Sequence, residues 1–160
     1  MAITMLNIFR KFVPTNRVLA LNKMSLFTAL TSREMKIVHG FMHERSYLKG
    51  EIIFDAGEEG QALYIVLEGK VLVCRQGHPE SPIATLERGN FFGEIALLDG
   101  GPRSGQVRAA EDCTMAVLFS GDFKNLMQSH GMIASKIALQ LALYLGTRLR
   151  LVLGADQVLL

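Results

Sequence analysis

The stretch from Phe91 to Ala109 holds the residues of this sequence that are best suited to chemistry, and it reads FFGEIALLDGGPRSGQVRA. Its apolar run from Glu94 to Leu98 lies between Gly93 and a Gly-Gly-Pro bend, which predicts about one helical turn with a sharp bend on either side. The first N–H groups of such a turn, those of Ile95 and Ala96, have no partner inside the helix and suit an anion. The sequence therefore predicts an anion site at this turn.

Two charged side chains beside this turn indicate what the ligand contains. Arg103 offers a planar fork of donors that matches two phosphate oxygens, and the Ser104 hydroxyl adds one more hydrogen bond. Glu94 is an acceptor only and would repel a phosphate, so it fits a hydroxyl donor such as a ribose 2′-OH. A phosphate and a free ribose hydroxyl together predict a nucleotide.

In these residues the sequence resembles the cyclic nucleotide-binding domains of the catabolite activator protein, the cyclic-nucleotide-dependent kinases and the cyclic-nucleotide-gated channels. Their phosphate-binding cassette is similar to Phe92-Gly93-Glu94 followed at the same spacing by Arg103-Ser104 and Val107. Gly105 and Gln106 depart from the alanine and threonine that are common in the family. A capped turn between two strands, without a ligand, is the alternative interpretation of this pattern.

Composition narrows the class of protein. A chain of 160 residues is of the size of one domain and buries about two-thirds of its unfolded surface. The formal net charge of +2 gives no general case for nucleic acid, whose binding depends on dense Lys and Arg contacts to phosphates. Cys74 and Cys113 are isolated and lack metal-ligand spacing, which fits a reducing cytoplasm.

Neither end of the chain predicts export or a membrane span. In the apolar segment from Met1 to Val13 the charges follow the apolar part, whereas in a signal peptide they precede it. The most apolar stretch, Met132 to Leu153, is interrupted by Lys136, Arg148 and Arg150 and so is not an unbroken run of ~20 apolar residues. We expect a cytoplasmic protein without a membrane segment.

Residues 1–24 are assigned to an N-terminal helical extension. Apolar residues among the first thirteen approximate one helical face, which Pro14 ends, and a second helical segment is predicted from Arg17 to Lys23. The first face packs on its own domain or on a partner. Peripheral attachment to a membrane, with Arg10 and Lys11 beside the apolar face, is the other interpretation.

Between residues 31 and 119 a helix gives way to strands. Thr31 and Glu34 match a capping box, which predicts a helix that runs to about His43. From Ser46 on, short β-rich runs alternate with turns that contain glycine, at 47–48, 52–54, 62–67, 71–75, 83–86 and 114–119. Many short strands at such spacing predict an antiparallel roll or barrel.

The C-terminal part is predicted to be helical. Ser120 is expected to cap a helix through Ser129, and Gly131 separates it from a final helix, Met132 to about Leu153. Two apolar stripes run along this last helix, one of Ile133, Ile137, Leu141, Tyr144 and Leu151 and a neighbouring one of Ala138, Leu145, Leu149 and Val152. Such a helix needs two partners, which we expect to be the β-roll and the same helix of a second subunit, with Leu141 in the seam.

The sequence gives little support for metal binding or for catalysis. His39 and His43 have an i, i+4 spacing, but no third metal ligand follows them. The nucleophile candidates Ser104 and Cys113 have no local base, and neither a Gly-x-Ser-x-Gly elbow nor a Walker-type loop is present. We therefore expect no metal, no cofactor and no catalysis, only binding.

The fold class that we expect is α+β: an antiparallel β-roll, jelly-roll-like, with N-terminal helices and a C-terminal hinge and lid helix. Residues 25–153 would form the cyclic nucleotide-binding domain and 154–160 a tail. The resemblance implies Glu94 on the ribose, Arg103 and Ser104 on the cyclic phosphate, and Gly93 with the Ile95 and Ala96 amides assisting. It implies Val73 and Ile83 against the base, with Tyr144 and Arg148 from the lid helix.

The function that we expect is that of a stand-alone regulatory module that binds cAMP, which we favour over cGMP because Ser104 matches the catabolite activator protein. The chain ends at Leu160 without a helix-turn-helix, kinase, channel or cyclase segment, so its output would pass to an unknown protein partner in trans. The alternative is an interaction module that has kept the fold but not the ligand. Gly105 and Gln106 favour that alternative, whereas Glu94 and Arg103 oppose it.

Overall fold

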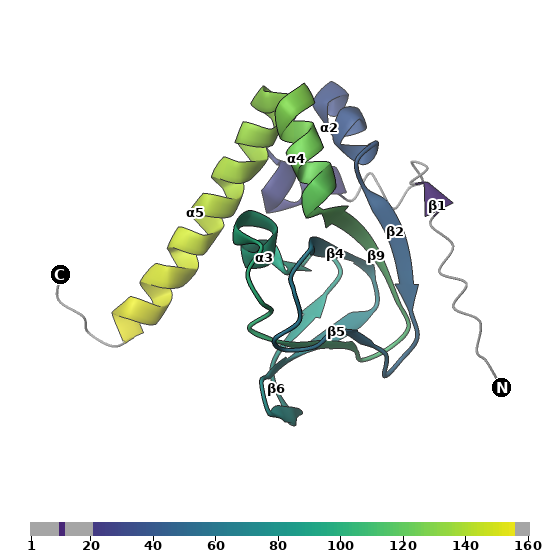
Figure 1. The fold of residues 1–160 in the computed structure, drawn as a ribbon, viewed down its shortest axis with the longest axis vertical. Coiled ribbons are helices and arrows are strands. Elements are labelled where there is room, and N and C mark those ends of the chain that lie inside the picture. The colour runs from purple at the N-terminus through teal and green to yellow at the C-terminus, as the bar shows by residue number, and fades with distance from the viewer. Residues whose placement is uncertain (1–9, 12–20, 156–160) are drawn as a thin grey trace.

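Two antiparallel sheets form a β-roll in the computed structural model, which describes residues 10–11 and 21–155 (Figure 1). The first sheet has the order β1-β2-β9-β4-β7 and consists of Arg10–Lys11, His43–Tyr47, Cys113–Phe119, Ala62–Glu68 and Phe91–Phe92. The second has the order β3-β8-β5-β6 and consists of Ile52–Phe54, Gly105–Ala109, Lys70–Arg75 and His78–Glu87. The predicted α+β fold with an antiparallel β-roll is confirmed.

The central strands β4 and β9 divide the interior into two apolar cores. Successive side chains of a strand point to opposite faces, so each strand serves both sides of the sheet. The inner core, inside the roll, takes Ala62, Tyr64 and Val66 of β4 and Met115 and Val117 of β9. The outer core, under the helices, takes Leu63, Ile65 and Leu67 of β4 and Ala116 and Leu118 of β9.

The outer core is covered by helices from both ends of the chain. They are two short 3-10 helices, η1 (Leu21–Lys23) and η2 (Ser25–Phe27), and the α-helices α2 (Ser32–His39), α4 (Ser120–Ser129) and α5 (Gly131–Ala155). Leu21, Phe27, Val38, Leu126 and Ile137 are almost fully buried in this layer. The face of the sheet that would otherwise be exposed is thus packed against helices, as a two-layer domain requires.

The capping box of α2 is confirmed, since the Thr31 side chain accepts from the Glu34 N–H and the Glu34 side chain accepts from the Thr31 N–H. The predicted end of this helix is wrong. It stops at His39 because Gly40 follows as the C-cap, and His43 already begins β2. The predicted cap of α4 is wrong too, because Ser120 is its first helical residue and the N-cap, Phe119, makes no side-chain cap hydrogen bond.

The N-terminal extension differs from its helical prediction where the structure describes it. Arg10 and Lys11 form β1, which pairs with Glu44 and His43 of β2 and so covers an edge of the first sheet that would otherwise be unpaired. Leu21–Lys23 form the 3-10 turn η1 in place of an α-helix. The remaining residues of both predicted helices lie outside the described part of the chain.

Helix α5 is buried in its first half and exposed in its second. Ile133, Ile137 and Leu141 are at most 5% exposed, whereas Leu151 is 71% exposed. In Figure 1 the helix starts beside α2 and α4 and then diverges from the β-roll. The expected place of Leu141 in a subunit seam is therefore wrong, because its side chain lies in the core of its own chain.

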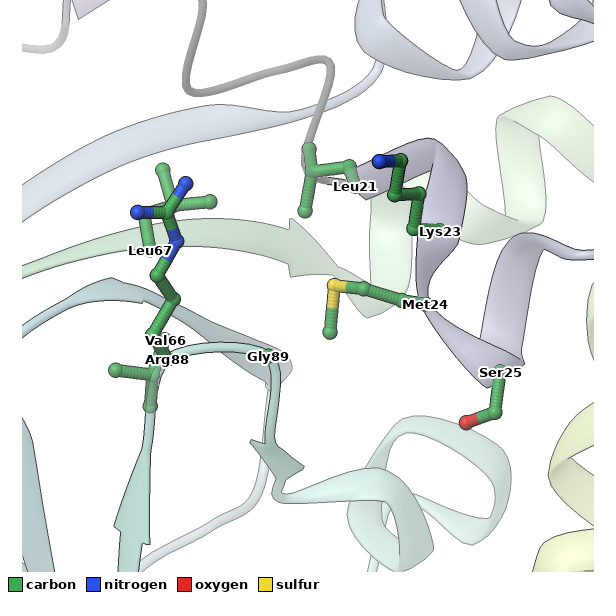
Figure 2. Close-up of a pocket in the computed structure, with 8 residues that line it drawn as sticks. All are labelled: Leu21, Lys23, Met24, Ser25, Val66, Leu67, Arg88 and Gly89. Atoms are coloured by element: carbon green, nitrogen blue, oxygen red, sulfur yellow. The ribbon is translucent and has the colours of Figure 1, made fainter.

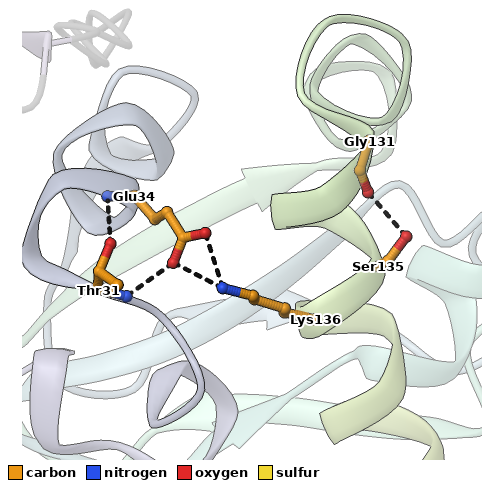
Figure 3. A network of polar contacts seen from close by, with 5 residues as sticks. All are labelled: Thr31, Glu34, Gly131, Ser135 and Lys136. Carbon is orange, nitrogen blue, oxygen red and sulfur yellow. Dashed lines mark hydrogen bonds and ion pairs between the residues drawn. The ribbon is translucent and has the colours of Figure 1, made fainter.

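A polar network joins α5 to α2 across the outer core (Figure 3). Lys136 Nζ donates to both oxygens of Glu34, at 2.7 and 2.9 Å, while the Thr31 N–H donates to Glu34 Oε2 at 2.8 Å. The hydrogen bond from Lys136, with the one from the Thr31 backbone, lowers the pKa of the Glu34 carboxyl below its ordinary value. One carboxylate thus both caps α2 and holds α5.

This network predicts a stability that depends on pH. Because the Glu34 pKa is lowered on folding, its contribution is present above the unfolded pKa and is lost as the pH falls through the folded one. We expect Lys136→Gln to lower the melting temperature at neutral pH, with a difference from the wild type that shrinks in acid. Lys124→Gln, at an exposed position of α4, is the control. A difference that stays constant down to pH 3 would contradict this role of Glu34.

Candidate functional site

A tight loop between β7 and β8 builds the site. Gly93 adopts a left-handed conformation with φ 81°, and α3 (Glu94–Asp99) follows at once and ends at Gly100, which has φ 68°. This short helix confirms the turn that the glycine spacing predicts. Gly60 lies so close that a Cβ there would stand 2.0 Å from the Ala96 Cβ, so the loop before β4 is packed directly against α3.

The Arg103 guanidinium lies inside the mouth of the roll, and its side chain is buried. Nη2 donates to the Ala62 carbonyl at 2.9 Å and Nη1 to the Gly93 carbonyl at 3.3 Å. The guanidinium carbon stands 4.0 Å from the centre of the Phe54 ring, within the range of a cation–π contact. Backbone carbonyls and a ring face thus hold the cation in one position.

The charge of Arg103 is only partly compensated. Its buried Nε finds no hydrogen-bond partner in the described part of the chain. Burial lowers the pKa of the guanidinium, while Tyr64, Glu58 and Glu94 act in the opposite direction. Arginine remains charged at neutral pH even so, and a buried, incompletely paired charge is costly. The site therefore holds a fixed cation with spare donors, which suits a polyoxygen anion.

Glu94, the first residue of α3, is only 9% exposed. Among the hydrogen bonds and ion pairs of the described residues, none ends on its carboxylate, which is unusual for a buried polar group. The negative charge of Glu94 acts to raise the pKa of Arg103, against the larger effect of burial, which lowers it. The site thus combines spare donors on Arg103 with a spare acceptor on Glu94.

The backbone and hydroxyl donors predicted for the anion lie on the same loop. The first helical bond of α3 runs from the Leu97 N–H to the Gly93 carbonyl at 3.3 Å, so the Ile95 and Ala96 amides precede it. Ser104 is exposed and follows Arg103 directly. These groups remain candidates for phosphate contacts, together with Arg103.

The two departures from the family pattern have local structural causes. A Cβ on Gly105 would stand 2.6 Å from the Cys74 carbonyl, so β8 approaches β5 too closely there for a larger residue. Gln106 Nε2 donates to Asp55 Oδ1 at 3.1 Å and so connects β8 to the end of β3. Both residues thus take part in contacts between β8 and the neighbouring segments of the roll.

The sequence patterns did not predict the aromatic cluster that lies beside Arg103. The Tyr64 and Phe92 rings are stacked, with centres 5.2 Å apart, and Phe54 lies 5.8 Å from each of them. Strand alternation could have predicted that Tyr64 and Phe92 share the inner core, since each occupies the strand position that faces it. Their contact with the arginine depends on how β3, β4 and β7 meet.

The residues assigned to the base occupy three different environments. Val73 is half-buried beside the inner core, whereas Ile83 on β6 is 58% exposed. The Tyr144 ring lies 4.6 Å from that of Phe91, and Arg148 Nη1 donates to the Tyr144 hydroxyl at 2.6 Å. Tyr144 thus contacts Phe91, the residue before Phe92, from the outer core, and Arg148 is joined to this contact only through Tyr144.

The described residues give no support for a metal site and only weak support for a membrane span. Within residues 10–11 and 21–155, no group of three or more His, Cys, Asp and Glu side chains is arranged to hold a metal ion. His43, a candidate ligand by spacing, instead pairs with Asp122 at 2.9 Å. Residues 131–154 of α5 are long and apolar enough to span a bilayer by length and composition alone, a weak criterion that core helices of soluble proteins also meet.

Comparison with known proteins matches this chain to one family. The cyclic nucleotide-binding domain family matches residues 44–130. The chain is 38% identical over 119 residues to the cyclic AMP receptor protein of Thermus thermophilus, covering 73% of this chain and 55% of that protein. It is 36% identical over 112 residues to a cyclic nucleotide-gated potassium channel of Rhizobium etli, covering 70% and 30%. It thus spans 55% of the length of the first relative and 30% of the second.

A solved structure gives the same result for the fold. The crystal structure of the catabolite activator protein of Thermus thermophilus superposes with a TM-score of 0.74 at 37% identity. The superposition covers 82% of this chain and 62% of that one.

Gly93→Ala should reduce the free energy of unfolding more than Gly50→Ala does. Both glycines have positive φ, 81° and 88°, and share the cost of about 1–2 kcal/mol for a side chain in that conformation. At Gly93 a Cβ would also stand 2.6 Å from Arg103 Nη1 and 2.7 Å from the Ala62 oxygen, whereas at Gly50 nothing lies within 4 Å. Urea unfolding measures both losses. Equal losses of unfolding free energy in the two variants would show that the Arg103 guanidinium moves aside at no cost.

Proposed function

This chain belongs to the cyclic nucleotide-binding domain family, and we propose that it binds cAMP at the loop of residues 92–104 and acts as a regulatory module rather than as an enzyme. The observation that carries the proposal is a pair of buried, incompletely partnered side chains in one loop: Arg103 with spare donors and Glu94 with a spare acceptor. A cyclic phosphate beside a free ribose hydroxyl satisfies both.

Each group takes the role that its chemistry allows. Arg103 binds the cyclic phosphate with Ser104 and the Ile95 and Ala96 amides, while Glu94 accepts the 2′-hydroxyl. Val73 and Ile83 of β5 and β6 supply apolar contacts to the base. Tyr144 and Arg148 respond from α5, because the contact between Phe91 and Tyr144 joins that helix to the strand that leads into the loop.

Two observations support the proposal that the chain binds cAMP and does not catalyse a reaction. The receptor of Thermus thermophilus, which is 38% identical to this chain, is named for cyclic AMP. The Ser104 hydroxyl has no hydrogen-bonded base among the residues that the structure describes, so nothing there activates it as a nucleophile. An interaction module without a ligand is the competing function, and calorimetry with cAMP, cGMP and AMP separates the two.

We further propose a cytoplasmic homodimer formed through α5, which signals to a protein partner. Met132, Leu139 and Leu143 are 75%, 58% and 56% exposed, and helical periodicity puts them on the face opposite Ile133, Ile137 and Leu141. A second α5 packed on this face would bury them symmetrically. Nucleotide and dimer would be coupled reciprocally if the position of α5 depends on the loop.

Arg103→Ala should weaken cAMP binding by roughly 100-fold or more while the protein stays folded. A charged hydrogen bond contributes ~1.5–3 kcal/mol, and the guanidinium makes at least two to the phosphate. Arg108→Ala, which removes an arginine from β8 outside the loop, is the matched control. Titration calorimetry measures both. Unchanged affinity in Arg103→Ala would exclude this arginine from the site, and displacement of cAMP by equal or lower cGMP would reverse the base preference.

The proposed contact between Glu94 and the ribose can be tested with a ligand that lacks the 2′-hydroxyl. The wild type should bind 2′-deoxy-cAMP more weakly than cAMP, by about tenfold or more, because the carboxylate then loses its donor. Glu94→Gln should narrow this difference between the two ligands. If the variant loses equal affinity for both, Glu94 shapes the loop instead of contacting the ribose.

Leu143→Glu should convert a dimer into a monomer without unfolding the chain, since the side chain points away from the core. Sedimentation velocity, with and without cAMP, measures the mass. Gln128→Glu adds the same charge at an exposed position of α4 and should leave the dimer intact. A monomeric wild type in both conditions would refute the dimer, and cosedimentation with neutral lipid vesicles would assign the exposed face of α5 to a membrane.

A further inference from the structure

A cavity of about 380 Å³ lies apart from the nucleotide loop, between the 3-10 helices and the turn that joins β6 to β7 (Figure 2). Its lining residues are Leu21, Lys23, Met24 and Ser25 on one wall and Val66, Leu67, Arg88 and Gly89 on the other. None of them belongs to the loop of residues 92–104. Its volume falls in the range of about 300–1,000 Å³ that is usual for small-molecule sites.

The inner part of this cavity is apolar. Leu21, Met24 and Leu67 are at most 7% exposed and belong to the outer core. Figure 2 shows the Met24 side chain pointing into the cavity from the helical wall. An apolar group placed here would leave water without displacing any polar contact, which is favourable in proportion to the area buried.

The rim of the cavity is cationic. Lys23 and Arg88 are both exposed and come from opposite walls (Figure 2). Among the residues that the structure describes, no acidic side chain lines the cavity, and neither cation forms an ion pair or a side-chain hydrogen bond with any of them. The Ser25 hydroxyl adds a neutral donor at the same rim. Two cations without a side-chain partner among the described residues, together with a hydroxyl, attract an anionic head group.

Both walls are held in place by backbone hydrogen bonds. The Gly89 N–H donates to the Val66 carbonyl at 3.0 Å and the Val66 N–H to the Asn90 carbonyl at 2.9 Å. On the helical side the Met24 N–H donates to the Leu21 carbonyl at 3.0 Å. The cavity is thus preformed, and a ligand would only have to order the two long cationic side chains.

We propose that this cavity binds a small anionic amphiphile, with its head between Arg88 and Lys23 and its apolar tail against Leu21, Met24 and Leu67. A bare anion would leave the apolar part unused, and a neutral hydrocarbon would leave both cations unpaired. A molecule that combines the two parts uses every kind of lining group. The site is separate from the nucleotide loop, so the proposal does not rest on the proposed function.

The test is titration calorimetry of the full chain with octanoate, 1-octanol and acetate. Octanoate should bind saturably, 1-octanol at least tenfold more weakly, and acetate not detectably. The double variant Lys23→Gln/Arg88→Gln should lower octanoate affinity at least tenfold, since each charged hydrogen bond contributes about that factor. Arg33→Gln/Lys36→Gln, which removes the same charge from the exposed surface of α2, should bind octanoate as the wild type does.

Several outcomes would overturn this assignment. They are the absence of saturable octanoate binding, equal affinity for 1-octanol, and an equal loss in the two double variants. Saturation with cAMP gives a further check, because the two sites share no lining residue. If cAMP displaces octanoate, or if Arg103→Ala abolishes octanoate binding, the probe occupies the nucleotide loop and the cavity proposal is wrong.

Discussion

The structure around the candidate site depends on one constraint, the burial of the Arg103 charge. A guanidinium that is 7% exposed needs acceptors, and the fold supplies them as the carbonyls of Ala62 and Gly93, with the Phe54 ring beneath. Gly93 can present its carbonyl there only in a left-handed conformation and without a Cβ. The Arg103 side chain therefore links the start of β4 and the left-handed bend at Gly93 to the chain at residue 103.

The two-core arrangement explains how that site is connected to the helices. Phe92 faces the inner core and stacks on Tyr64, whereas its neighbour Phe91 faces the outer core and meets Tyr144 of α5. Strand alternation alone sends the two rings to opposite sides. A change of the loop at Gly93 has a short physical route to α5 through this pair, and the hydrogen bond between Arg148 and Tyr144 extends it along the helix.

Helix α5 combines two surfaces that differ in what they contact. Its first half completes the outer core and is held to α2 by the pair of Lys136 and Glu34. Its second half diverges from the roll with Leu149, Leu151 and Val152 exposed. Exposed apolar residues in such number are characteristic of a surface that packs on something else. The same helix therefore contacts Phe91 through Tyr144 and leaves a row of apolar side chains exposed on its outer face.

Local patterns of the sequence determined much of this protein. The capping box of Thr31 and Glu34, the turn from Glu94 to Asp99 and the alternation that gives the roll all depend on neighbouring residues, so they could be predicted. The family pattern also singled out Glu94 and Arg103, which the structure shows as buried charged residues of one loop. Two predicted helix boundaries were wrong. Helix α2 ends at His39 and α4 begins at Ser120, because helix ends depend on a balance of weak preferences.

Only the tertiary structure decided which long-range partners meet. The strand at Arg10–Lys11 exists because β2 offers an edge, and no local signal shows that edge. Leu141 looked available to a second subunit because a helical stripe does not reveal which face its own domain covers. Phe54 and Tyr64 meet Arg103 from different strands, and the cavity at Met24 joins segments more than 40 residues apart, as its lining residues show. Periodicity fixes which side chains share a face, whereas packing between distant segments decides what that face contacts.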